Sequence, residues 1–159
     1  MPELRHYVGL IPARAGSRAI PNKALASLAG RPLLDYTVEA ALGAERIEEV
    51  LVSTEDESIA GRARQLGAGI LVRPTHLATD HMSMDPVILH AIENLEGRGG
   101  SEAGREIWIV LLQPTSPLRT RGDIDAAVEH LERTGAQGLV SVQEMDREAY
   151  KYMTVGPEG

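Results

Sequence analysis

A cationic, glycine-containing segment near the start of the chain, Pro12 to Lys23, is the first feature that could do chemistry. Guanidinium and ammonium groups donate charge-assisted hydrogen bonds to phosphate oxygens, and a glycine allows a φ value or a close backbone approach that a Cβ would forbid. We therefore predict that this segment, here called the first loop, binds a triphosphate. Its candidate ligand-binding residues are Arg14, Gly16, Ser17, Arg18 and Lys23.

The first loop matches neither of the two commonest glycine-rich phosphate motifs. A dinucleotide fingerprint needs G-x-G-x-x-G, and a P-loop needs glycine directly before its lysine, whereas Asn22 precedes Lys23. A solvated surface loop whose basic side chains face water is the alternative interpretation of these residues.

The charge distribution favours a small anionic ligand. The chain has 159 residues and a net charge of -7, but residues 1–31 contain five basic side chains and one acidic side chain. This segment is therefore cationic within an acidic protein. Proteins that bind a nucleic-acid backbone usually need a net positive face, so we expect no nucleic-acid partner.

The composition excludes other classes of protein. The chain has no cysteine, which excludes a disulfide scaffold, a cysteine-ligated zinc site and a thiol nucleophile. No run approaches the roughly 20 apolar residues of a membrane span, and the first ten residues lack a signal-peptide pattern. We expect a cytoplasmic protein with no membrane partner.

Alternating strands and helices must position the first loop. Short apolar runs predict strands at residues 7–13, 49–53, 69–73, 107–112 and 138–142. Helical spacing predicts helices at residues 33–42, from about 54 to 67, from 85 to about 95, and 124–131. Thr54 and Glu57 could form a capping box for the second helix, and Asp85 is the expected N-cap of the third. Residues 107–112 are the most apolar run, as expected at a sheet centre.

This order of elements predicts an α/β fold with an open, doubly wound, mostly parallel sheet. Such sheets bind ligands at the carboxyl ends of their strands, so the loops after residues 7–13, 69–73 and 107–112 should form the site. Residues 55–57 also follow a strand and could border the site, although a capped helix N-terminus explains them equally well.

Five segments together resemble the acylneuraminate cytidylyltransferases, the family that makes CMP-sialic acids and related CMP-nonulosonates. The resemblance covers residues 7–143, and the combination of its first and last segments is highly specific. It implies a Rossmann-like nucleotide-diphospho-sugar transferase fold. It also implies a reaction in which the anomeric hydroxyl of a nine-carbon acidic sugar attacks the α-phosphate of CTP, with Mg²⁺ assistance and release of pyrophosphate. The segments are IPARAGSRAIPNK (11–23), LAGRPL (28–33), VST (52–54), RP (73–74) and LLQPTSPLR (111–119).

The resemblance implies roles for individual residues. Arg14 and Lys23 match catalytic cations that hold the triphosphate and neutralise charge on the leaving pyrophosphate. The remaining nucleotide-binding positions in the first loop are Ala13, Gly16, Ser17 and Arg18. Those that read cytosine and ribose are Arg73, Asp80 and Ser83. Gln113 matches a residue between ribose and sugar, and Thr115 and Ser116 continue the wall of the sugar site.

The chain departs from the family pattern at three places. Ala24 stands where the family usually has asparagine, and Met82-Ser83-Met84 replaces a stretch that usually carries two hydroxyls. The family also continues into a segment that contributes to dimerisation and supplies two aspartates for Mg²⁺, and nothing after Val142 resembles it. We therefore expect a nucleotide-binding core at residues 1–143, a truncated C-terminal segment from residue 144, unassigned metal ligands and a possible homodimer.

Two alternatives to an acylneuraminate enzyme stay open. One is a nucleotidyltransferase of the same fold for another sugar, such as the eight-carbon Kdo, whose relatives lack a loop of the LLQPTSPLR type. The other is a nucleotide-binding module that has lost turnover, favoured by Ala24 and by the absent C-terminal segment.

Overall fold

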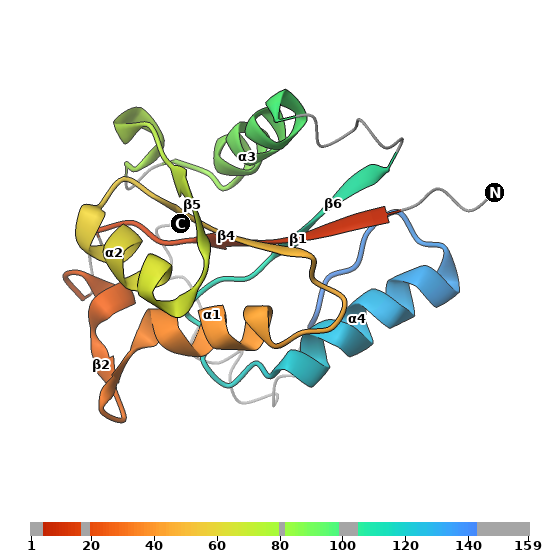
Figure 1. Cartoon of the computed structure of the whole chain (residues 1–159), viewed down its shortest axis with the longest axis horizontal. Helices are drawn as coiled ribbons and strands as arrows, with labels where there is room; N and C mark the ends of the chain where they lie inside the picture. Colours follow the sequence, from red (N-terminus) through yellow and green to blue (C-terminus); the bar gives the residue numbers. More distant parts are fainter. Residues whose placement is uncertain (1–4, 17–19, 80–81, 99–104, 143–159) are drawn as a thin grey trace, which may run out of the picture.

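A parallel sheet of four strands forms the centre of the computed structural model, which describes residues 5–16, 20–79, 82–98 and 105–142. Within these ranges the strand order is β5-β4-β1-β6, and every neighbouring pair is parallel (Figure 1). Gly9 in the middle of the first strand pairs with Val50 on one side and Val110 on the other. The strands are β1 (Arg5–Pro12), β4 (Glu49–Thr54), β5 (Gly69–Val72) and β6 (Glu106–Leu111).

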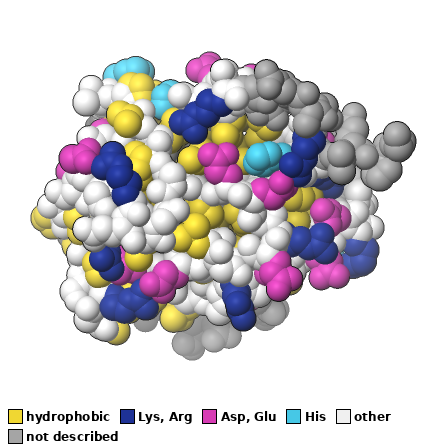
Figure 2. Space-filling model, in the orientation of Figure 1, with side chains coloured by type: hydrophobic (Ala, Val, Ile, Leu, Met, Phe, Trp, Pro, Cys, Tyr) yellow, Lys and Arg dark blue, Asp and Glu magenta, His cyan; other side chains and the backbone are white. Residues whose placement is uncertain are grey.

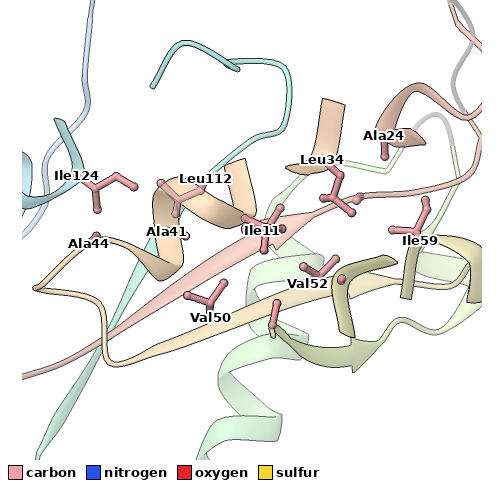
Figure 3. Packing of buried hydrophobic residues seen from close by; sticks show 14 residues of the cluster. Ile11, Ala24, Leu34, Ala41, Ala44, Val50, Val52, Ile59, Leu112 and Ile124 are labelled. Carbon is pink, nitrogen blue, oxygen red and sulfur yellow. The ribbon is translucent and has the colours of Figure 1, made fainter. Parts of the chain in front are cut away.

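Helices cover both faces of the sheet, which confirms the doubly wound fold predicted from the sequence. Because side chains alternate along a strand, Ile11 packs with helices α1, α2 and α4 on one face (Figure 3), whereas Leu10 packs with α3 on the other. Figure 1 shows α3 on one side of the sheet and the remaining helices on the opposite side. The helices are α1 (Leu33–Leu42), α2 (Glu57–Leu66), α3 (Asp85–Gly97) and α4 (Arg121–Thr134).

The helix α4 begins at a complete capping box. The Thr120 side chain accepts a hydrogen bond from the Asp123 backbone N–H, and the Asp123 carboxylate accepts one from the Thr120 N–H. The helix ends at Gly135, whose φ of 63° lies in the left-handed region. Asp123 therefore has a structural role at the start of this helix.

Two of the predicted caps are wrong by one or two residues. Strand β4 continues through Thr54, so Asp56 becomes the N-cap of α2 and accepts from the Ile59 N–H at 2.9 Å. The Thr54 hydroxyl instead accepts from the Asp56 N–H, which closes the turn between strand and helix. Helix α3 has Met84 as its N-cap, so Asp85 lies inside the first turn.

A small hairpin that the sequence pattern did not predict follows the first loop. Lys23–Leu25 forms a 3-10 turn (η1), and β2 (Ser27–Leu28) pairs antiparallel with β3 (Arg31–Pro32). The turn between the two strands places Ala29 at φ 50° and Gly30 at φ 83°. A second 3-10 turn, η2 (Thr75–Leu77), lies in the loop after β5.

The structure corrects two predictions about the sheet. Residues 138–142 form no strand, and Val140 and Val142 are about nine-tenths exposed. The apolar run predicted at residues 107–112 forms most of β6, which lies at an edge and not at the centre of the described sheet. Both corrections have the same physical reason. Among the described residues no further strand pairs with β6, and the side chains of β6 are therefore only partly buried.

Candidate functional site

The switch point of the sheet lies at the carboxyl ends of β1 and β6. From β1 the chain adds β4 and β5 on one side, and α3 then carries it back across the sheet to β6 on the other side. Loops that leave two neighbouring strands in opposite directions leave a crevice between them, where open α/β sheets bind ligands. The first loop and the 113–120 loop flank this crevice.

A cleft of about 140 Å³ occupies this position. Residues of the first loop form one side of it, and Pro114 and Thr115 of the 113–120 loop contribute to the other. We call it the first-loop cleft. Its lining residues are Pro12, Ala13, Arg14, Gly16, Lys23, Ala24, Leu33, Pro114 and Thr115.

Two cations line the first-loop cleft. Arg14 follows the end of β1, and Lys23 begins η1, so the loop returns to the cleft after leaving the strand. Asn22 makes this return possible, because it adopts a left-handed conformation and its carbonyl accepts from the Leu25 N–H at 2.8 Å and the Ala26 N–H at 3.1 Å. The backbone conformation at Asn22 is thus consistent with Arg14 and Lys23 lining the same cleft.

The backbone beside these cations is tied to the end of β4. The Ala13 N–H donates to the Ser53 carbonyl at 3.0 Å, and Ala13 is buried. Gly16, three residues further on, does not have a positive φ, and a Cβ placed on it would lie 3.5 Å from Arg14 Nη1. The backbone conformation at residue 16 therefore does not require glycine. A side chain at this position would enter the space beside Arg14.

Arg73 is buried at the end of β5 and reaches back to β4. Its Nε donates to the Ser53 hydroxyl at 3.1 Å, and its Nη2 donates to the Ser53 carbonyl at 2.8 Å. Burial lowers the pKa of the Arg73 guanidinium, the negative charge of Glu55 opposes this shift, and the positive charge of Arg14 adds to it. Arg73 is therefore electrostatically coupled to the first-loop cleft, although it is not among the residues that line it.

Glu55 connects the first loop to the sheet. It follows β4 directly, and its Oε1 accepts a hydrogen bond from the Ala15 N–H at 2.9 Å. Among the described residues, its Oε2 is buried and has no hydrogen-bond partner. Sequence reasoning placed Glu55 at the border of the site but gave it no role; its position directly after a central strand was the available signal.

The 113–120 loop is closed by its own backbone. The Gln113 carbonyl accepts from the Ser116 N–H at 3.3 Å and from Arg119 Nη2 at 3.4 Å. Burial lowers the pKa of Arg119, which Asp123 at the start of α4 partly opposes. The turn presents Thr115 to the first-loop cleft, whereas Gln113 and Ser116 are exposed.

The structure brings together only part of the predicted site. Ala13, Arg14, Gly16, Lys23 and Thr115 share the first-loop cleft. Ala24, which replaces the family asparagine, also lines the cleft but is buried in the core beneath it. Of the remaining predicted positions, Arg73, Ser83, Gln113 and Ser116 do not line the cleft, and Ser17, Arg18 and Asp80 lie outside the described residues.

A protein-built metal centre is not found in the described ranges, where no three His, Asp or Glu side chains lie together as ligands would. Mg²⁺ bound with a substrate triphosphate usually takes only one or two carboxylates and fills its remaining positions with phosphate oxygens and water. The absence of a three-ligand cluster among the described residues therefore does not bear on a Mg²⁺ ion that is bound together with a triphosphate. Among the described helices, none is long and apolar enough to cross a membrane.

Charged side chains are mixed on the face of the molecule that Figure 2 presents. Basic and acidic groups alternate there without forming a one-signed surface. This face of the molecule therefore presents mixed charge and no extended cationic surface.

Comparison with known proteins decides the family. A family model described as cytidylyltransferase matches residues 8–155, nearly the whole chain. The chain belongs to the cytidylyltransferase family. The match includes β1, the first loop and the 113–120 loop, so the first-loop cleft is built by the residues that carry the family likeness.

Individual relatives differ in the sugar that their names specify. An N-acylneuraminate cytidylyltransferase of Escherichia coli O18:K1:H7 is 40% identical over 122 residues, which is 77% of this chain and 27% of that protein. A 3-deoxy-manno-octulosonate cytidylyltransferase of Anaeromyxobacter dehalogenans is 42% identical over 130 residues, which is 81% of this chain and 48% of that protein. The chain thus spans less than half the length of either relative.

A solved structure supports the fold. A synthetase for CMP-2-keto-3-deoxy-manno-octonic acid, in complex with CTP, superposes with a TM-score of 0.63 at 22% identity, covering 82% of this chain and 49% of that one. Similarity at this level concerns the fold alone, and it agrees with the parallel sheet and flanking helices described above.

Proposed function

We propose that this chain is the CTP-binding core of an enzyme that transfers CMP from CTP to an acidic sugar and releases pyrophosphate. The observation that carries the proposal is the pairing of Arg14 with Lys23 in one cleft at the switch point of a cytidylyltransferase-family sheet. A guanidinium and an ammonium group are the donors that phosphate oxygens bind best. The acceptor we propose is N-acylneuraminate or a related nonulosonic acid.

The proposed reaction is a substitution at the α-phosphorus of CTP. The anomeric hydroxyl oxygen of the sugar forms a bond to this phosphorus, the hydroxyl proton is lost to solvent, and the bond to the pyrophosphate oxygen breaks. Negative charge then builds up on the leaving pyrophosphate, and Arg14 and Lys23 would stabilise it. We propose that Mg²⁺ accompanies the triphosphate and that the protein's ligands to this metal ion lie beyond the described residues. We also propose that the reaction takes place in the cytoplasm.

Thermal unfolding with nucleotides tests the nucleotide part of the proposal. CTP with Mg²⁺ should raise the melting temperature more than ATP, GTP or UTP do, because at equal concentration the ligand that binds the folded state more tightly stabilises it more. Equal shifts for all four nucleotides, or no shift, would contradict a cytidylyltransferase.

Pyrophosphate release tests turnover and acceptor. We expect release when CTP and N-acetylneuraminate are both present and none when either is omitted. Selective binding of CTP without release with any acceptor would identify a nucleotide-binding module.

A Kdo acceptor is the second candidate, and one observation favours it. The relative named for 3-deoxy-manno-octulosonate is 42% identical to this chain, so sequence identity does not separate an eight-carbon from a nine-carbon acceptor. The same assay decides between them, because release of pyrophosphate with Kdo and not with N-acetylneuraminate would reverse the assignment.

A further inference from the structure

We propose that Glu55 is a positioning residue for the first loop, and that it fixes the loop in its ligand-binding shape before a nucleotide arrives. The inference rests on the proposed function, because it concerns how the same cleft holds a triphosphate. Glu55 directly follows β4 and is not part of the first loop, and it lies 40 residues away from its partner Ala15 in the sequence.

The first step of the argument is the hydrogen bond to Ala15. Its N–H donates to Glu55 Oε1 at 2.9 Å, and its two neighbours, Arg14 and Gly16, both line the first-loop cleft. A hydrogen bond to a backbone N–H holds the peptide plane to which that N–H belongs, here the plane that joins Arg14 to Ala15. Glu55 therefore orients the part of the loop that carries the Arg14 side chain, without lining the cleft itself.

The second step is the charge. The positive charges of Arg14 and Arg73 interact unfavourably, whereas the Glu55 carboxylate interacts favourably with Arg73 and opposes the effect that burial has on its pKa. A negative charge at this point offsets the repulsion between two arginines while the cleft holds no anion. The Glu55 Oε2 is buried and has no hydrogen-bond partner among the described residues, which costs free energy that a solvated carboxylate would not lose.

The two effects can be separated by substitution. Glu55→Gln keeps an oxygen that accepts from the Ala15 N–H but removes the charge, whereas Glu55→Ala removes both. If positioning dominates, Glu55→Ala should raise the Kd for CTP about tenfold, as loss of one charge-assisted hydrogen bond would, and Glu55→Gln should bind at least as tightly as the natural chain. Loss of the charge leaves the arginines more attractive to an anion.

Glu57→Gln is the matched control. It removes the same charge two residues further on, from an exposed side chain that pairs with Arg64 on helix α2. We expect its Kd for CTP to be unchanged. All four proteins are titrated well below their melting temperatures with CTP and, separately, with inorganic tripolyphosphate.

Hydrogen exchange at the Ala15 amide supplies a local readout of the hydrogen bond to Glu55. We expect protection in the natural chain and in Glu55→Gln, and fast exchange in Glu55→Ala. Fast exchange in the natural chain overturns the proposal even if Glu55→Ala fails to fold, and so does an equal rise in Kd for both Glu55 variants.

The tripolyphosphate arm separates this inference from the proposed function. If the natural chain binds tripolyphosphate but shows no preference for CTP over UTP, the proposed function fails while the order of the Glu55 variants still decides the inference. If the natural chain prefers CTP and the Glu55 variants match it, the inference fails and the function stands. Binding of neither probe contradicts both.

Discussion

Replacing Arg73 by lysine should destabilise the protein, because Arg73 joins the ends of β5 and β4 from a buried position. The guanidinium uses two nitrogens on one residue, donating to the Ser53 hydroxyl at 3.1 Å and to the Ser53 carbonyl at 2.8 Å. Both side chains are at least 96% buried. A lysine ammonium is a point donor that cannot reproduce this fork, so Arg73→Lys loses at least one hydrogen bond from a charged group.

The expected cost follows from these contacts. A hydrogen bond to a charged group contributes roughly 1.5–3 kcal/mol, so Arg73→Lys should lower the free energy of unfolding by about 2 kcal/mol. For a protein of this size that corresponds to a fall of about 6 °C in melting temperature. Ser53→Ala removes one hydrogen bond to the same charged group, so it should cost a similar amount, about 2 kcal/mol.

Urea unfolding of both single variants and the double variant measures the interaction directly. Because Ser53→Ala removes a partner of Arg73, the two costs should not add, and we expect a coupling energy of about 1 kcal/mol. Unchanged stability in Arg73→Lys, together with weaker CTP binding, would refute this reasoning. It would mean that Arg73 contacts the ligand, as the sequence analysis predicted, without supporting the sheet.

Two further predictions concern the first loop and helix α4. Gly16→Ala should change the free energy of unfolding by no more than about 0.5 kcal/mol, because Gly16 lacks a positive φ. It should raise the Kd for CTP, because the new Cβ enters the cleft beside Arg14. A large loss of stability in urea unfolding would contradict this prediction. Asp123→Asn should lower the melting temperature at pH 7, because hydrogen bonds from Thr120 lower the pKa of the folded-state carboxyl. Stabilisation by a group with a lowered pKa is present above its ordinary pKa of about 4 and is lost as the pH falls through the folded value, so the two melting temperatures should converge below pH 4. A gap that stays constant down to pH 2 would contradict the capping role.

The sequence predicted the architecture well because the apolar periodicity was strong. Helix α1 has the predicted bounds, since Pro32 and Gly43 mark its ends. The predicted strand at residues 138–142 is wrong for the described chain, because apolar alternation shows that a segment could pair and does not show that a partner strand is present. The same limit explains why the run predicted at residues 107–112 forms an edge strand of the described sheet.

The site was predicted in part. Arg14 and Lys23 share one cleft, as expected from a cationic loop after a strand at a switch point. Glu55 received no role, because its contact with Ala15 depends on β4 lying beside β1 and joins residues 40 positions apart. The buried hydrogen bonds of Arg73 to Ser53 were missed for the same reason, since a motif names residue types but not the neighbours that strand order supplies.

The most direct test of the central claim is the Kd of CTP for Lys23→Gln, measured by calorimetry in the presence of Mg²⁺. Lys23 lines the first-loop cleft, and losing one cationic contact to a phosphate should raise the Kd about tenfold or more. Arg46→Gln is the matched control, because its exposed side chain pairs with Glu132 at the opposite end of the sheet. We predict weaker CTP binding for Lys23→Gln and natural affinity for Arg46→Gln. Equal affinities for all three proteins would contradict triphosphate binding in the first-loop cleft.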